Sequence, residues 1–277
     1  MEHTAGTDGA GPAMLSQLSS IWKFRTFLMS LIRKDLRARY RRSAFGIGWS
    51  LLQPILMTVV FCIVFGAWFK NPDWRSYGPY FLAGMTLFTF VRESVVTGCS
   101  TFFDNENYIR QCPAPLTLYT LRTIAGIGIH FLIALMVVVL AVLVLQPHMA
   151  VKMLTASWAV VPAVMMLFCF CWSISVIASF IAVYFYDAAH LAEVLFQILF
   201  FLTPIIYPVS MIVDRQLTII LTLNPIVAYL EIIRTPLLTG QVPPAWAFVK
   251  AGIVTATSAT AALGTMAWLQ RRLIYKL

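Results

Sequence analysis

The most constraining feature of this sequence is the junction between a strongly basic segment and a long apolar run. Residues 31–54 place six cationic side chains before the apolar run that begins near Phe45: Arg33, Lys34, Arg37, Arg39, Arg41 and Arg42. Lys and Arg residues that flank a membrane-spanning helix are concentrated on its cytoplasmic side. The junction therefore predicts a membrane boundary and the orientation of the chain that follows.

Composition places the whole chain in the membrane class. Hydrophobic residues make up 60% and charged residues 11% of the 277 residues, whereas soluble domains carry about 45–50% apolar and about 25% charged residues. The net charge of +9 does not indicate a nucleic-acid partner, because the positive charge is concentrated before residue 43 and at the C-terminal end, beside predicted spans.

The apolar runs predict an all-α integral membrane protein with six transmembrane helices. The expected spans are residues 46–69, 77–103, 116–145, 158–185, 191–207 and 245–269, within a membrane domain of residues 45–277. Residues 1–19 are expected to form a disordered cytoplasmic tail. Residues 20–44 are expected to form an amphipathic helix at the inner membrane surface, because apolar and basic residues take opposite faces. Both termini are then cytoplasmic.

Residues 209–240 lie between the fifth and sixth expected spans and have a different pattern. Their two apolar pieces are interrupted at Asp214-Arg215, Asn224-Pro225 and Thr235-Pro236. Apolar segments of about 10–14 residues are too short to span a bilayer. The pattern predicts a re-entrant helical hairpin in the outer leaflet, shielded by protein because unpaired backbone is costly in lipid.

The second expected span contains two charged residues, Arg92 and Glu93. Each costs about 2.5–3.5 kcal/mol at the centre of an isolated span, so neither is expected to face lipid. Adjacent positions do not face one another on a helix, so a mutual ion pair is not expected. Two interpretations stay open: the residues face a protein interface or a wet cavity, or they lie shallow and snorkel towards the cytoplasm.

The chain lacks the common motifs of catalysis and nucleotide binding. No P-loop, H-E-x-x-H or G-x-S-x-G motif occurs, so no ATP site, zinc protease site or nucleophile elbow is predicted. The cysteines have no zinc-site spacing, and His130, His148 and His190 are far apart in the sequence. We therefore expect no catalytic residue, metal or cofactor in this chain, and we expect the energy for any uphill transport to come from another subunit.

Residues 39–54, RYRRSAFGIGWSLLQP, closely resemble the segment that leads into the first helix of ABC-2 type permeases, specifically membrane subunits of exporters for O-antigen, teichoic acid and capsule-type polysaccharides. Three later segments agree with the same family in order: residues 84–107, residues 202–207 (LTPIIY), and Asn224-Pro225 followed by Arg234. The resemblance covers nearly all of the chain after Trp22.

Two segments depart from the family pattern. Tyr186-Asp187-Ala188 stands where Arg-Asp with a following aliphatic residue is common, and residues 112–115, CPAP, replace a basic-aromatic-Pro sequence. Both lie in expected cytoplasmic turns. They affect the details of coupling to an ATPase rather than the family resemblance.

The resemblance implies a half-transporter that forms a homodimer in the cytoplasmic (inner) membrane and binds two copies of a separate ABC ATPase, which holds ATP and Mg²⁺. Its cargo would be a glycan or lipid-linked glycan, as in lipopolysaccharide biosynthesis. The coupling surface would comprise Arg33, Arg37, Asn105, Asn107, Tyr108, Arg110 and Asp187. The alternative is that these are solvated loop and headgroup-binding residues.

The glycan pathway of such an exporter is expected to be lined by aromatic side chains. The candidates on the first, second and fifth spans are Phe61, Phe65, Trp68, Tyr80, Phe81, Phe200 and Tyr207. The alternative for each is a structural or lipid-facing role. Two other functions stay open: an ABC-2 permease for a drug or lipid, and a membrane-embedded glycosyltransferase or acyltransferase.

Overall fold

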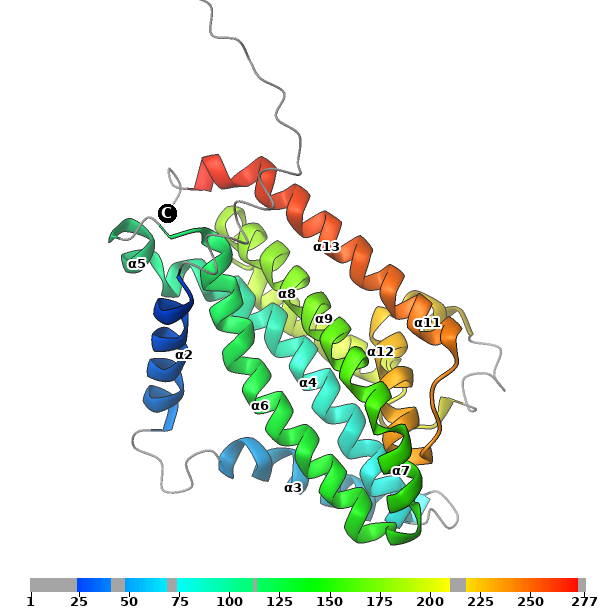
Figure 1. Cartoon of the computed structure of the whole chain (residues 1–277). Helices are drawn as coiled ribbons and strands as arrows, with labels where there is room; N and C mark the ends of the chain where they lie inside the picture. Colours follow the sequence, from blue (N-terminus) through cyan, green and yellow to red (C-terminus); the bar gives the residue numbers. More distant parts are fainter. Residues whose placement is uncertain (1–23, 41–47, 69–73, 112–113, 210–217, 274–277) are drawn as a thin grey trace, which may run out of the picture.

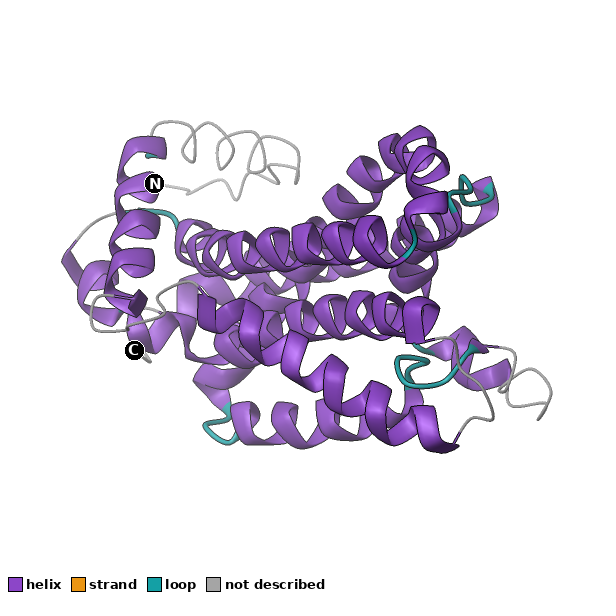
Figure 2. Cartoon of the chain, turned by 90° about the horizontal axis from the view of Figure 1, so that it is seen from below, coloured by secondary structure: helices purple, strands orange, loops and turns teal. Residues whose placement is uncertain are grey.

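The computed structural model describes residues 24–40, 48–68, 74–111, 114–209 and 218–273. These residues form helices joined by short connections, and no strand occurs among them (Figure 2). The expected cytoplasmic tail of residues 1–19 lies outside the described residues. The all-α class predicted from the apolar runs is confirmed for the described part of the chain.

The bundle is built around the long helix α4 (Trp74–Asp104). Figure 1 shows α4 running beside α6 (Leu116–Leu145), α8 (Val160–Tyr184) and α9 (Ala188–Leu202), with α13 (Ala245–Leu273) packed along α8. The helix α3 (Gly48–Trp68) contacts α4 and α6. The side chain of Cys62 on α3 lies against Gly78 near the start of α4.

Among the described residues, three segments are long and apolar enough to cross a membrane: Leu116–Leu145, Pro147–Tyr184 and Ala245–Leu269. Leu52–Val64 and Ala188–Leu202 are shorter apolar helices. Helix α4 is long, but Arg92 and Glu93 interrupt its apolar sequence. The fold is thus that of a helical membrane protein, and the expected number of six spans stays a prediction.

Residues 146–157 lie between the third and fourth expected spans and were expected to form an outer loop, but nearly all of them are helical. They form the turn η1 (Pro147–Met149), the helix α7 (Ala150–Ala156) and the turn η2 (Ser157–Ala159), which leads into α8. The side chains of Met153 and Ala156 are buried, so this segment packs onto the bundle. Burial of these apolar side chains stabilises helical turns where a loop was expected.

The segment expected to be re-entrant contains α11 (Thr218–Leu223), α12 (Pro225–Arg234) and the π-helical turn η3 (Thr235–Thr239), while residues 210–217 lie outside the described part. The break at Asn224-Pro225 has a local cause: the Asn224 side chain accepts a hydrogen bond from the Ile226 amide at 3.0 Å, and proline suits the first position of a helix. At the expected break, Thr235-Pro236, the α-helix ends at Arg234, but the chain stays helical. The π-helical turn is followed by Gly240, which has a φ of 65°. This is a left-handed backbone conformation that glycine adopts without steric cost.

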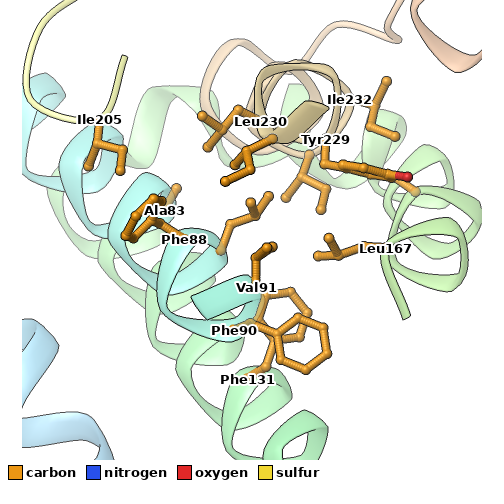
Figure 3. Packing of buried hydrophobic residues seen from close by; sticks show 14 of the residues in the cluster. Ala83, Phe88, Phe90, Val91, Phe131, Leu167, Ile205, Tyr229, Leu230 and Ile232 are labelled. Atoms are coloured by element: carbon orange, nitrogen blue, oxygen red, sulfur yellow. The ribbon is translucent and has the colours of Figure 1, made fainter. Parts of the chain in front are cut away.

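The main hydrophobic core lies between α4, α6, α8 and α12 (Figure 3). The rings of Phe90 on α4 and Phe131 on α6 stack with centroids 4.5 Å apart. The close approach of α4 and α8 depends on Gly98, because a Cβ there would lie 2.8 Å from the Ser175 hydroxyl. Ser179 donates a hydrogen bond to the Gly98 carbonyl at 2.7 Å. Small residues and hydroxyl groups thus permit the helices to approach closely, as is typical of membrane proteins.

The helix α2 (Arg25–Tyr40) covers the central part of the expected amphipathic segment, residues 20–44. Leu31 and Ile32 on its apolar face are buried, and the helix packs against α6. Arg33, Lys34 and Arg37 are exposed. Figure 1 shows α2 and the short helix α5 (Glu106–Gln111) at the end of the bundle where α6 begins.

Candidate functional site

A network of charged side chains joins α2, α4 and α6 at this end of the bundle. Arg122 on α6 donates two hydrogen bonds to the Asp35 carboxylate on α2, at 2.6 Å from Nε and 2.5 Å from Nη2. Its Nη1 donates to the Asn105 side-chain oxygen at 2.5 Å. Asn105 in turn donates to the Thr101 carbonyl of α4 at 2.7 Å. A planar guanidinium suits such fork-like contacts, so one residue connects three elements.

Tyr108 on α5 extends this network to a second residue of α2. Lys34 donates a hydrogen bond to the Tyr108 hydroxyl at 2.9 Å, and the Phe27 ring meets the Tyr108 ring edge to face at 6.5 Å. The guanidinium of Arg122 lies 5.8 Å from the Tyr108 ring centroid. The hydrogen bond and positive charge of Lys34 lower the pKa of the Tyr108 hydroxyl below its ordinary value.

The predicted coupling residues occupy different positions around this network. Asn105 and Tyr108 belong to it, whereas Arg33, Arg37 and Asn107 are exposed beside it. Arg110 is exposed and pairs with Glu106 at 2.7 Å within α5. Asp187 is exposed in the turn between α8 and α9. That turn contacts the end of α4, because Tyr186 stacks on Phe103 with centroids 5.6 Å apart.

Sequence reasoning missed the two residues that form the centre of this network, Asp35 and Arg122. Asp35 interrupts a basic helix, and Arg122 lies within two turns of the start of an otherwise apolar helix. An isolated acidic residue and an isolated basic residue in such places are a signal for a mutual pair. Their separation of 87 residues gives no local indication of the contact.

A cavity of about 700 Å³ lies between α3, α4, α6 and α9. Seven phenylalanine side chains line it: Phe61, Phe88, Phe90, Phe131, Phe196, Phe200 and Phe201. Polar and charged side chains also line it: Gln53, Arg92, Glu93, His130, Glu193 and Gln197. The cavity can therefore contact both apolar and hydrogen-bonding parts of a cargo.

Arg92 and Glu93 form an ion pair in the wall of this cavity, with Nη1 and Oε1 2.8 Å apart. The expectation that neighbouring residues would not pair is wrong here, because the long arginine side chain bends back to its neighbour. The two side chains are 38% and 34% exposed. They thus face a cavity, as one of the two interpretations of these residues expected.

The predicted pathway aromatics divide between the cavity and its surroundings. Phe61 and Phe200 line the cavity. Phe81 is fully buried behind Phe61, with ring centroids 4.5 Å apart. Phe65 and Trp68 belong to α3, but their side chains lie outside what the structure describes. The remaining two candidates, Tyr80 and Tyr207, lie in a separate polar cluster.

That cluster surrounds the buried guanidinium of Arg234, at the end of α12. Arg234 donates a hydrogen bond from Nη1 to the Pro204 carbonyl at 2.6 Å, and its Cζ lies 3.9 Å from the Tyr80 ring centroid. The Tyr80 hydroxyl donates to the Pro204 and Tyr207 carbonyls, each at 3.1 Å. Gly84 leaves the space for the guanidinium, because a Cβ there would lie 1.8 Å from Nη2. Arg234 thus connects α12 to the segment after α9.

The described residues include no group of three or more His, Cys, Asp or Glu side chains that could hold a metal ion. His130, His148 and His190 lie on α6, in η1 and on α9.

Long apolar helices, a mixed aromatic and polar cavity and a charged network at one end together define a helical membrane protein with an internal binding space. The chain belongs to the ABC-2 type transporter family, whose sequence profile matches residues 26–238.

Three relatives share the name O-antigen export system permease protein RfbA. The protein from Myxococcus xanthus is 28% identical over 222 residues, which cover 78% of this chain and 81% of the relative. Two proteins from Klebsiella pneumoniae are each 24% identical over 199 residues, which cover 72% of this chain and 75% of each relative. The family predicted from residues 39–54 is thus confirmed.

Proposed function

We propose that this chain is the permease subunit of an ATP-driven exporter that moves a lipid-linked polysaccharide of the O-antigen type outward across the cytoplasmic membrane. The observation that carries the proposal is the cavity of about 700 Å³ with its aromatic and polar walls. Membership of the ABC-2 family and the name of the relatives support the same function.

The lining of the cavity suits a polyhydroxylated cargo. Aromatic rings present flat apolar faces to the C–H surfaces of sugars, while the amides of Gln53 and Gln197 can donate to and accept from hydroxyl groups. A drug or lipid cargo has few hydroxyl groups to pair with the amides and carboxylates of the wall. A glycan is therefore favoured over those alternatives, and no residue set in the described chain supports a transferase.

The energy for transport comes from a separate ATPase subunit that holds ATP and Mg²⁺. This chain has no P-loop sequence of its own. The exposed cations of α2 and α5 offer a surface for that subunit: Arg33, Arg37 and Arg110, with Asn107 and Asp187 nearby. Docking there can move the cavity wall, because Arg122 joins α2 to α6 and Asn105 joins α6 to α4, and both α4 and α6 line the cavity.

The assembly is a homodimer of this chain with two ATPase copies. Each chain crosses the cytoplasmic membrane six times, with both termini in the cytoplasm and residues 209–240 re-entrant from the outside. The exposed apolar face of α9 supports contact with lipid or a second copy: Leu191, Val194, Leu195 and Ile198 are all at least half exposed. A channel between two copies would join two such cavities.

Purification of the tagged chain from native membranes in mild detergent tests the assembly. Mass spectrometry should find an ABC ATPase in equal amount, with two copies of each chain. Inverted membrane vesicles that contain this complex should transport a lipid-linked glycan only when ATP is present. Recovery of the chain alone in several detergents, or transport that does not need ATP, would contradict the proposal.

A charge-reversal variant tests the coupling surface. We expect Arg37→Glu combined with Arg110→Glu to lower ATP-dependent export about tenfold. A surface of exposed cations would bind an acidic surface of the ATPase, and the introduced glutamates would repel it. Lys152→Glu is the matched control, since Lys152 is an exposed cation on α7 at the other end of the bundle. Membrane levels of both variants are compared with the wild type by immunoblotting. Normal export by the double variant would show that this surface does not couple.

A further inference from the structure

The polar wall of the cavity carries an unbalanced negative charge. The positive charge of Arg92 is matched by Glu93, which lies 2.8 Å away. A second carboxylate, that of Glu193 on α9, lines the same cavity and is exposed. No cationic side chain among the described residues lies within ion-pair distance of Glu193. With histidine counted as neutral, the described lining is left with one negative charge per chain.

The position of Glu193 on α9 indicates that its side chain faces the transport pathway and not the lipid. Gln197, one helical turn later, lines the cavity with Glu193, as do Phe196 and Phe200. The apolar residues of α9 that face outward lie between these positions. A carboxylate in contact with hydrocarbon is strongly unfavourable, so a charged residue at this place in an apolar helix belongs to a wet, protein-lined space.

We infer that Glu193 makes this exporter selective for uncharged glycans over acidic ones, and the inference rests on the proposed function. A carboxylate accepts hydrogen bonds from sugar hydroxyl groups. It repels the carboxylate of a uronic acid or the phosphate of an anionic polymer, and this repulsion is stronger in a cavity with low-dielectric walls than in water. An unpaired charge that opposes one class of cargo is a common source of specificity. In a homodimer the pathway carries two such charges.

Export of two matched cargoes tests the inference. Cells without a permease of their own express this chain with its ATPase and receive either a lipid-linked neutral polymannose or a polymer of equal length with a hexuronic acid in each repeat. The measured quantity is the ratio of acidic to neutral glycan at the cell surface. The wild type should give a ratio of about one tenth or less. Glu193→Gln should raise the ratio about tenfold, and Glu193→Lys should raise it further.

Two further variants make the test specific to the cavity. Gln197→Glu adds a second carboxylate one turn away, so it should lower the ratio below that of the wild type. Glu231→Gln makes the same chemical change on α12, outside the cavity lining, and should leave the ratio at the wild-type value. Equal ratios in the Glu193 variants and in Glu231→Gln would overturn the inference, as would efficient export of the acidic polymer by the wild type.

The result also separates the inference from the function on which it rests. If the wild type exports the neutral glycan but the ratio does not depend on Glu193, the proposed function stands and the inference fails. If the wild type, inserted in the membrane and bound to its ATPase, exports neither polymer, both fail.

Discussion

Removal of the Arg122 guanidinium should loosen α2 from the bundle while the bundle itself stays folded. Arg122→Met keeps most of the side-chain volume but removes the two hydrogen bonds to Asp35 and the one to Asn105. The apolar contacts of Leu31 and Ile32 remain. The variant therefore changes the free energy of detaching α2 more than the free energy of unfolding the whole chain.

The burial of the ion pair sets the size of this effect. Exposed pairs contribute about 0–1 kcal/mol, whereas breaking a buried pair costs about 3–5 kcal/mol. The side chain of Arg122 is 12% exposed and that of Asp35 is 44% exposed, so the pair lies between these limits. A cost of about 2 kcal/mol increases the detached population about thirtyfold, since about 1.4 kcal/mol corresponds to a factor of ten.

Hydrogen exchange of the α2 amides measures this population directly, because local opening limits exchange in a folded protein. We expect exchange in residues 25–40 to accelerate about thirtyfold in Arg122→Met and to stay at the wild-type rate in the core helices α4 and α8. Arg37→Met removes an exposed cation from the same helix and is the control. The reversed pair, Asp35→Arg with Arg122→Asp, should restore part of the protection. Less than about threefold acceleration in Arg122→Met would refute the proposed role of the ion pair.

Two further predictions concern the other polar contacts. Gly84→Ala should displace the buried guanidinium of Arg234, because the new Cβ would lie 1.8 Å from Nη2; we expect a loss of about 2–4 kcal/mol, seen as a lower Tm in detergent, and a Tm equal to that of the wild type would contradict this. Lys34→Met should raise the pKa of Tyr108 towards its ordinary value, because the hydrogen bond and charge that lower it are lost. The ionisation is followed by absorbance at 295 nm, with Tyr108→Phe to isolate the signal. Since the folded-state pKa is lowered, this contact stabilises the fold above the pKa of the unfolded chain, and the contribution is lost as the pH falls through the folded-state pKa. An unchanged Tyr108 pKa in Lys34→Met would show that Lys34 is not the cause.

The membrane class, the helical fold and the family could be predicted from the sequence because each depends on local or additive properties. Apolar runs of sufficient length determine helices in a bilayer, whatever their neighbours are. The helix break at Asn224-Pro225 is likewise local, since the asparagine side chain caps the helix that proline begins. At Thr235-Pro236 the α-helix also ends, but the chain continues in a π-helical turn in which Pro236 and Leu237 are buried, and this continuation depends on tertiary surroundings that the local sequence does not show.

The predicted site residues were chosen by residue type and position, and the structure places five of them in three different environments. Asn105 and Tyr108 join the charged network, Phe61 and Phe200 line the cavity, and Tyr80 contacts Arg234. Aromatic content alone could not separate these environments, because a ring in a membrane helix has the same sequence signature in each of them.

The sequence by itself determined that this chain is a helical membrane protein of the ABC-2 family, because hydrophobic length and a specific motif suffice for that. Only the tertiary structure decided which charges meet. Asp35 and Arg122 are 87 residues apart in the chain, and Glu193 reaches the cavity wall that Arg92 and Glu93 form on another helix. The physical reason is that a buried or membrane-embedded charge is stabilised by its three-dimensional surroundings, which depend on how the helices pack and not on the neighbours of the residue in sequence.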